Sequence, residues 1–337
     1  MTELPKLKVL FATYSWAFET PGGGEMQLMK YAKHLPSHGV DVQLHDPWRA
    51  NLADVSVVHY FSCLGGSGHF CAQVKNRGLP LVISSSLWIT DETRHLYPVD
   101  EIRTQLSLAD VIVTNSEVES DQLSRILKLP RGRFSAVLNG VEPDFASAGP
   151  QPFWDQFKVS GPFVLNVANI EPRKNQLSLV RAMKDLAVPL VLIGAVRDRA
   201  YAEAVFCEGG SQLRYLGAME HGDPALASAF AACSAFALPS TLETPGLAAL
   251  EAAACGASIV VTSEGSTREY FGSQAHYVDH RDPGDIRAGI ERALAGRPDP
   301  ELRRRVSSQF AWFSVTAALV DVYRAAQSRN RAGAPHG

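Results

Sequence analysis

Short apolar runs alternate with amphipathic stretches from one end of the chain to the other. Most of these runs are rich in β-branched residues and lack polar–apolar alternation, which is typical of strands buried on both faces. The runs predicted as strands are Val9–Thr13, Val42–His45, Val55–Tyr60, Leu81–Ser84, Val111–Asn115, Ser135–Leu138, Val164–Val167, Pro189–Ile193, Leu213–Leu216, Ala235–Leu238, Ser258–Thr262 and His276–Val278. Because strands separated by helices connect through right-handed crossovers, the pattern predicts an α/β fold with parallel sheets.

The alternation stops once, in a segment rich in Gly, Pro and Ser that we interpret as a linker over residues 148–162. It predicts two doubly wound, Rossmann-like domains, residues 1–147 and 163–310, with a ligand at the carboxyl ends of the strands in the cleft between them. A last helix is expected over 311–328. Its apolar residues exceed what one domain face needs, which favours a helix that crosses back to the first domain. The tail 329–337 is expected to be disordered.

Composition narrows the class of partner. The 337 residues are 46% hydrophobic and carry a net charge of −3, with 13 basic and 16 acidic residues up to position 150 and 19 of each after it. Neither half has the positive charge that nucleic acid favours. No apolar run reaches the length of a membrane span, and the N-terminus lacks the features of a signal peptide. Five cysteines without a C-x-x-C pair fit buried, reduced thiols, so a cytoplasmic location is expected.

Two glutamates, Glu243 and Glu251, stand eight residues apart in LPSTLETPGLAALEAAACGAS. The stretch predicts a strand, a loop that carries Glu243, and a helix with Pro245 in its first turn and Glu251 inside it. The N–H groups of Gly246 and Leu247 would then face the space that the loop encloses, where a helix N-terminus suits a phosphate. With a carboxylate on either side, the arrangement suits a nucleotide sugar. The alternative, a solvated loop residue and a surface helix residue, stays open on these two residues alone.

Two further motifs carry candidate chemistry. Gly23 and Gly24 follow the first strand and precede a helix expected to start near Glu25, so they indicate either a phosphate or acceptor loop or a flexible turn. Arg173 and Lys174 follow the strand VLNVAN, at the strand end where a doubly wound fold keeps its ligand. Both side chains match phosphate oxygens, and a solvated basic turn is the alternative.

Together these motifs resemble a known family. ETPGLAALE resembles the E-x7-E motif of the retaining glycosyltransferases of family 4, which have the GT-B fold. IEPRKN resembles the phosphate-binding turn of that family, in its E-P-R-K-N form. ADVIVTNSEVESDQL and FSAVLNGVEPDF resemble its stretch that ends in an N-G-V turn. The resemblance extends from about Val9 to Tyr323, with the motifs in the family's order.

The resemblance implies two facing Rossmann-like domains and transfer of a hexosyl unit from a nucleotide diphosphate sugar, GDP- or UDP-linked, to a saccharide or glycolipid hydroxyl. It implies a bacterial polysaccharide or glycoconjugate pathway, no cofactor and no metal. Glu243, Arg173 and Lys174 would be catalytic: the glutamate would hold sugar hydroxyls, and the two cations would neutralise the diphosphate. The implied donor-binding residues are Glu251, which would hold the ribose, and Thr244, Pro245, Gly246, Leu247, Glu269, Gly23 and Gly24.

The chain departs from the family pattern at two positions. Ser86 stands where many members have a histidine, and Asn169 where many have an arginine that the adjacent Arg173 would replace. Ser86 and His59 are the candidates on the acceptor side, although a packed histidine is the commoner case at a strand end. The stretch TDETRHLYPVDEIRTQL has more acids than bases, so at most weak peripheral membrane contact is expected.

Two other functions remain open at this point. One is a nucleotide-sugar epimerase of the same architecture, although Ser86 supplies no acid or base beside the sugar ring. The other is an inactive relative that binds the donor without turnover, to which Ser86 and Asn169 give some weight.

Overall fold

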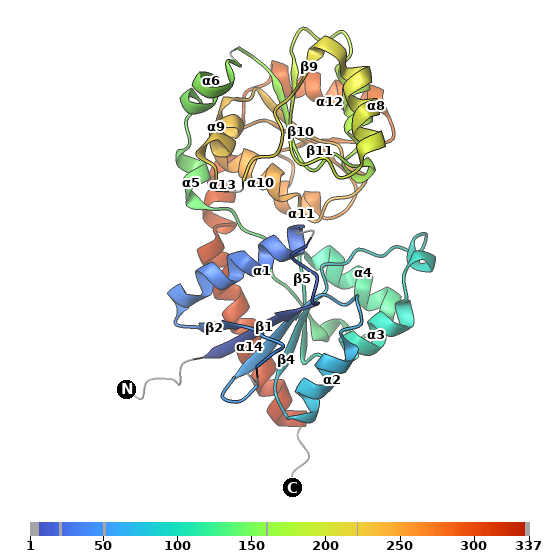
Figure 1. The fold of residues 1–337 in the computed structure, drawn as a ribbon, viewed down its shortest axis with the longest axis vertical. Helices are drawn as coiled ribbons and strands as arrows, with labels where there is room; N and C mark the ends of the chain where they lie inside the picture. Colours follow the sequence, from blue (N-terminus) through green and yellow to red (C-terminus); the bar gives the residue numbers. More distant parts are fainter. Residues whose placement is uncertain (1–6, 20–21, 50–51, 160, 221, 334–337) are drawn as a thin grey trace. The chain divides into compact units, whose positions relative to one another are not determined.

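The computed structural model divides into two compact units and describes residues 7–19, 22–49, 52–159, 161–220 and 222–333. Unit 1 contains the described residues up to Asn139 together with those from Trp312 onward, and unit 2 is Gly140–Ala311 (Figure 1). Each unit contains a six-stranded parallel sheet with helices on its faces. The predicted α/β fold with two doubly wound sheets is confirmed.

Unit 1 has the strand order β2-β1-β3-β4-β5-β6. Its strands are β1 Lys8–Thr13, β2 Asp41–Leu44, β3 Val57–Phe61, β4 Leu81–Ser84, β5 Val111–Thr114 and β6 Phe134–Ala136. Its helices are α1 Gly23–His34, α2 Gly68–Asn76, α3 Val99–Leu108, α4 Glu117–Leu127 and α14 Trp312–Gly333. The order reverses between β1 and β3, which places the topological switch point of this sheet, where such folds bind ligands, at the ends of these two strands.

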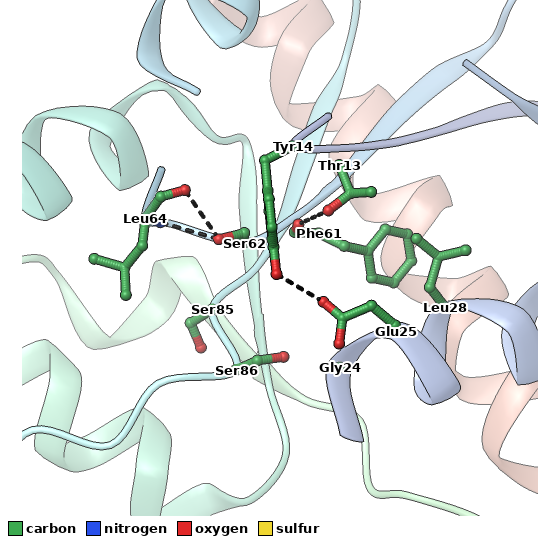
Figure 2. Close-up of a pocket in the computed structure, with 10 residues that line it drawn as sticks. All are labelled: Thr13, Tyr14, Gly24, Glu25, Leu28, Phe61, Ser62, Leu64, Ser85 and Ser86. Carbon is green, nitrogen blue, oxygen red and sulfur yellow. Dashed lines mark hydrogen bonds between the residues drawn. The ribbon is translucent and has the colours of Figure 1, made fainter. Parts of the chain in front are cut away.

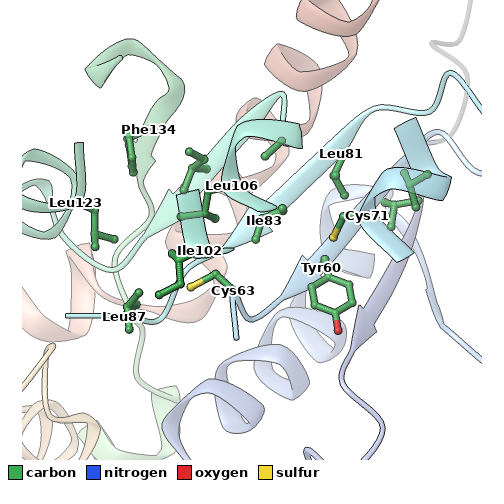
Figure 3. Close-up of a cluster of buried hydrophobic side chains, with 14 of the residues drawn as sticks. Tyr60, Cys63, Cys71, Leu81, Ile83, Leu87, Ile102, Leu106, Leu123 and Phe134 are labelled. Carbon is green, nitrogen blue, oxygen red and sulfur yellow. The ribbon is translucent and has the colours of Figure 1, made fainter. Parts of the chain in front are cut away.

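Both faces of the unit 1 sheet are buried. On one face the side chains of β3 and β4 pack with those of α2, α3 and α4, and Figure 3 shows Ile83, Ile102 and Leu106 within this cluster. On the other face Val9 and Val57 pack with Leu319 and other side chains of α14. Burial on both faces explains why these strands lack polar–apolar alternation in the sequence.

Unit 2 has the strand order β12-β11-β10-β7-β8-β9, which reverses between β7 and β10. Its strands are β7 Val164–Val167, β8 Leu190–Ile193, β9 Leu213–Tyr215, β10 Ala235–Leu238, β11 Ile259–Thr262 and β12 His276–Val278. Its helices are α5 Pro143–Ser147, α6 Gln151–Phe157, α7 Gln176–Met183, α8 Arg199–Gly209, α9 Pro224–Ala232, α10 Leu247–Cys255, α11 Thr267–Phe271, α12 Pro283–Ala295 and α13 Pro300–Gln309. The ends of β7 and β10 are therefore the expected ligand position of this sheet.

The boundaries between the units differ from those predicted. Residues 148–162 were predicted as a linker, but they include α6, which packs on α9, and the described part of this segment belongs to unit 2. The cause is Phe153, which is fully buried within a segment otherwise rich in loop-forming residues. Helix α14 groups with unit 1 and continues to Gly333, past the predicted end at 328, while 334–337 of the predicted tail lie outside the described residues. Along the described residues, none of the helices combines the length and apolar character needed to cross a bilayer.

Candidate functional site

The switch point of unit 2 carries the two motifs that the sequence analysis singled out. Strands β7 and β10 are hydrogen-bonded neighbours. The turn Pro172–Lys174 follows β7, and the loop with Glu243 follows β10. Because parallel strands end at the same edge of a sheet, the two loops lie side by side, and hydrogen bonds described below connect them.

The partly buried Lys174 and the buried Glu243 form an ion pair. The Lys174 Nζ lies 2.5 Å from the Glu243 Oε1, and the two side chains are 14% and 5% exposed. An ion pair out of water is costly to form and costly to break, because a single partner would be left as an unpaired buried charge. The interpretation of Glu243 as a solvated loop residue is therefore wrong, and the pair fixes both side chains at the switch point.

Hydrogen bonds hold the turn Pro172–Lys174 against the neighbouring loops. The Thr241 N–H donates to the Arg173 carbonyl oxygen at 2.9 Å. The Asn175 side-chain amide donates to the carbonyl oxygens of Pro239, at 3.0 Å, and His280, at 2.7 Å. Asn175 has φ 57, a left-handed conformation that asparagine tolerates better than most residues. Asn175 thus connects the loops after three strands, a role that sequence reasoning missed although the residue ends the IEPRKN motif.

The loop after β11 holds the main chain of Glu243. The Ser266 N–H donates to the Glu243 carbonyl oxygen at 3.0 Å, and the Glu243 N–H donates to the Glu264 carbonyl oxygen at 3.3 Å. Between them Gly265 has φ 97, and a Cβ atom built there would lie 2.1 Å from the Glu243 carbonyl oxygen. Only glycine fits such an approach. Sequence reasoning missed this support, and a glycine three residues past the predicted strand Ser258–Thr262 was the available signal.

Helix α10 begins later than predicted. Pro245 was expected in its first turn, but the helix starts at Leu247, after a cis Thr244–Pro245 bond and Gly246 at φ 84 and ψ 81. That conformation is not helical, so the helix can begin only after Gly246. A Cβ at Gly246 would lie 3.3 Å from the Glu243 Oε2, which places the glycine directly against the carboxylate. The start of α10 and the ion pair therefore belong to one site.

Glu251 lies about one turn into α10, closer to the helix start than the predicted boundary implied. It is 7% exposed, so the interpretation as a surface helix residue is wrong. Burial raises the pKa of the Cys255 thiol, one turn further along the helix, to about 12, and the charge of the Glu251 carboxylate contributes to this shift. Glu269 is half-buried on α11, the short helix that follows the loop supporting Glu243.

Arg173 and Asn169 are placed differently from Lys174. The Arg173 side chain is 54% exposed, with its guanidinium 3.3 Å from the Glu171 carboxylate. It is thus available to a ligand at low cost, whereas Lys174 must leave a buried partner. Asn169 is half-buried, and its carbonyl oxygen accepts a hydrogen bond from the Gln176 side chain at 2.9 Å.

The switch point of unit 1 holds a pocket of about 220 Å³ (Figure 2). The ends of β1, β3 and β4 and the first turn of α1 line it: Thr13, Tyr14, Gly24, Glu25, Leu28, Phe61, Ser62, Leu64, Ser85 and Ser86. The Tyr14 hydroxyl donates to the Glu25 Oε1 at 3.0 Å, and the Gly22 N–H donates to the Glu25 Oε2 at 2.8 Å. Sequence reasoning missed Tyr14 and Glu25, although a glutamate three residues after a helix N-cap is a known capping pattern.

The predicted residues of unit 1 fall in two groups. Gly24 and Ser86 line the pocket, and a Cβ built on Gly24 would lie 3.8 Å from the Ser86 hydroxyl oxygen. Gly23 is the first residue of α1, which starts two residues before the predicted position.

His59 does not line the pocket, so its assignment to the acceptor side is corrected. It is fully buried, with ring nitrogens 2.9 Å from the Tyr323 hydroxyl and 2.8 Å from the Ser84 hydroxyl. Burial lowers the pKa of His59 to about 3, so it stays neutral near pH 7. The side chain points to the core from a strand whose residues are all buried, so the end of the strand gives it no access to a ligand.

A family model and the related sequences both match this chain to glycosyltransferases. Residues 152–310 match the family described as "Glycosyl transferases group 1". The O-antigen chain mannosyltransferase B of Escherichia coli is 26% identical over 248 residues, which cover 68% of this chain and 64% of that protein. The D-inositol 3-phosphate glycosyltransferase of Mycolicibacterium smegmatis is 28% identical over 240 residues, 67% of this chain and 55% of that protein. The chain thus spans less than two thirds of the length of these curated relatives.

Solved structures match over nearly the whole chain. The sucrose-phosphate synthase from Thermosynechococcus elongatus has a TM-score of 0.76 at 18% identity, covering 94% of this chain and 98% of that one. The Anabaena protein HepE in complex with UDP-glucose has a TM-score of 0.72 at 17% identity, covering 94% of this chain and 99% of that one. At such identities the likeness concerns the fold, and it confirms the predicted GT-B architecture.

Proposed function

We propose that this chain, which carries a glycosyl transferases group 1 domain in residues 152–310, transfers a hexosyl unit from a nucleotide diphosphate sugar to a saccharide or glycolipid hydroxyl, with retention of configuration. The observation that carries the proposal is the Lys174–Glu243 ion pair, largely shielded from water, beside the start of α10. The proposal is supported because a cation suited to a diphosphate and a carboxylate suited to sugar hydroxyls lie within one hydrogen bond of each other, at the switch point of the sheet.

The reaction needs charge stabilisation more than a nucleophile. Breaking the bond from the anomeric carbon to the phosphate leaves negative charge on the departing diphosphate. Lys174, Arg173 and the N-terminus of α10 supply positive charge that is fixed before the reaction begins, and fixed charges of this kind stabilise a transition state effectively. The acceptor hydroxyl attacks from the face that the diphosphate leaves, and the phosphate takes its proton. This course retains the configuration of the anomeric carbon, and none of its steps requires a metal ion.

Donor binding would exchange the partners of the ion pair. A diphosphate attracts the Lys174 ammonium away from Glu243, whose carboxylate is then free to accept hydrogen bonds from sugar hydroxyls. A free nucleotide diphosphate attracts Lys174 but has no sugar hydroxyls for Glu243, so it leaves the Glu243 carboxylate buried and unpaired. We infer that the site favours the nucleotide sugar over the released nucleotide. The HepE structure is a complex with UDP-glucose, and the Escherichia coli relatives are named mannosyltransferases, so UDP- and GDP-linked hexoses are the first donors to test.

Two glutamine variants test this division of roles. Glu251→Gln is expected to weaken binding of the free nucleotide diphosphate by about 10-fold to 100-fold, since it removes a charge-assisted hydrogen bond to the ribose. Glu243→Gln is expected to leave that affinity unchanged or higher, because it frees Lys174, and to reduce sugar transfer. Calorimetric titration with UDP and GDP measures the first effect, and NMR of the sugar with an acceptor measures the second. Equal weakening of nucleotide binding by both variants would contradict these roles.

A further inference from the structure

The pocket of unit 1 differs in charge from the switch point of unit 2. Among the described residues that line it, Glu25 alone carries a charge. The others present hydroxyls, an aromatic ring, aliphatic side chains or bare backbone. Sites for phosphorylated ligands depend on arginine, lysine or open helix N-terminal N–H groups, as the Arg173–Lys174 turn illustrates. None of the described lining residues of this pocket is a cation.

The N-terminus of α1 does not compensate for that lack. The Glu25 carboxylate accepts the Gly22 N–H at 2.8 Å, so the negative charge that a helix N-terminus attracts is already supplied by the chain. The Tyr14 hydroxyl donates to the other carboxylate oxygen at 3.0 Å and fixes its orientation. Burial raises the pKa of Tyr14, and the Glu25 carboxylate raises it further. The phenol therefore stays protonated and keeps donating its hydrogen bond to Glu25. A second anion beside Glu25 would meet a fixed like charge.

The same groups suit an uncharged polyol. A carboxylate offers about four acceptor positions, and two are occupied here, so Glu25 retains capacity for hydroxyl donors. The Ser86 hydroxyl, on an exposed residue, has no hydrogen-bond partner within the described chain and can donate or accept. Tyr14 adds a ring to the pocket wall, and Trp16, 58% exposed, packs edge-to-face on that ring at 5.4 Å. A volume of about 220 Å³ fits a small unit such as one sugar ring.

We propose that this pocket binds one uncharged, unphosphorylated sugar ring of the acceptor, and that Glu25 excludes phosphorylated acceptors. The proposal rests on the proposed function, since it specifies the acceptor of the same transfer. This acceptor would separate the chain from relatives whose names contain a phosphorylated compound, such as D-inositol 3-phosphate glycosyltransferase and sucrose-phosphate synthase.

The test compares matched neutral and phosphorylated probes on the wild-type protein. Saturation-transfer NMR titrations would use the methyl α-glycosides of mannose, glucose, galactose and N-acetylglucosamine, each beside its 6-phosphate. We expect at least one neutral glycoside to bind and its 6-phosphate to bind at least tenfold more weakly. Absence of binding by every neutral glycoside, or equal or tighter binding of a phosphate, would overturn the proposal. The wild-type ratio decides the matter without any substitution.

Substitutions then assign the selectivity to one carboxylate. Glu25→Gln keeps the shape of the side chain and removes its charge, so the neutral-to-phosphate ratio should fall by at least fivefold. Glu101→Gln, which removes an exposed acid on α3, is the control for net charge and should leave the ratio unchanged. An unchanged ratio in Glu25→Gln, with an unchanged melting temperature, would refute the role of Glu25. Nucleotide-sugar binding is measured separately, so a failure of the transferase proposal would show there while the charge selectivity could still hold.

Discussion

Replacing Lys174 with methionine is expected to lower kcat/KM for sugar transfer by about 10²-fold to 10³-fold, the loss typical of removing one preorganised group that stabilises developing charge. The Lys174 side chain is only 14% exposed, and its ammonium, by our proposal, moves from Glu243 to the departing diphosphate. Methionine preserves most of the side-chain volume and removes only the charge. Steady-state transfer kinetics with the best donor and acceptor would measure the loss, and a decrease below threefold would contradict the role.

The same substitution should also destabilise the protein, by about 3 kcal/mol, because it leaves the 5%-exposed Glu243 carboxylate without its counter-charge. The double variant Lys174→Met/Glu243→Gln separates the two effects. Neutralising both partners should recover most of the stability, measured by urea unfolding, but none of the activity. Lys184→Met, at an exposed lysine after α7, is the matched control and should alter neither. Recovery of activity in the double variant would show that Lys174 acts only through the fold.

Gly265→Ala is expected to lower the free energy of unfolding by about 2–4 kcal/mol, from a positive φ together with a steric overlap. The backbone there has φ 97, and the new Cβ would lie 2.1 Å from the Glu243 carbonyl oxygen, so one of the two loops must move. Since the same loop holds Glu243 through the Ser266 N–H, movement should also reduce transfer. Chemical denaturation and transfer kinetics on one preparation measure both consequences.

Gly217→Ala provides the control for that variant. Gly217 has φ 79, so alanine is conformationally disfavoured there too, but its Cβ would meet nothing within 4 Å. Gly217→Ala should lower the free energy of unfolding by about 1 kcal/mol, because only the backbone conformation is disfavoured. Equal losses for the two variants would mean that the contact between Gly265 and Glu243 does not hold the site.

Much of the fold could be predicted because its strands are buried on both faces. Val164–Val167 and Ala235–Leu238 were predicted with the bounds that the structure shows, since burial of both faces requires an unbroken apolar run. The rule that ligands lie at strand ends at the switch point placed the Arg173–Lys174 turn and the Glu243 loop at the same end of the sheet, but the ion pair between Lys174 and Glu243 was not predicted. The motif order and the family resemblance supplied the rest of the candidate site in unit 2.

The remaining features depend on contacts that sequence patterns do not encode. The late start of α10 depends on the backbone angles of Gly246, and α6 forms where loop residues were expected because Phe153 is buried against other parts of unit 2. His59 was placed on the acceptor side from its position at the end of a strand, but burial decides its environment. The Tyr14–Glu25 hydrogen bond joins a strand end to a helix start, and the capping pattern around Glu25 gives no sign of this contact with Tyr14.

The most direct measurement is a calorimetric titration of the wild-type protein with UDP-, GDP-, ADP- and dTDP-linked hexoses. By the proposed function, the protein should bind at least one of them more tightly than the matching free nucleotide diphosphate, and Lys174→Met should abolish that preference. Adding an acceptor to the bound donor should then release the nucleotide with the sugar transferred in its original anomeric configuration. Binding of none of these donors would contradict the assignment of the site in unit 2.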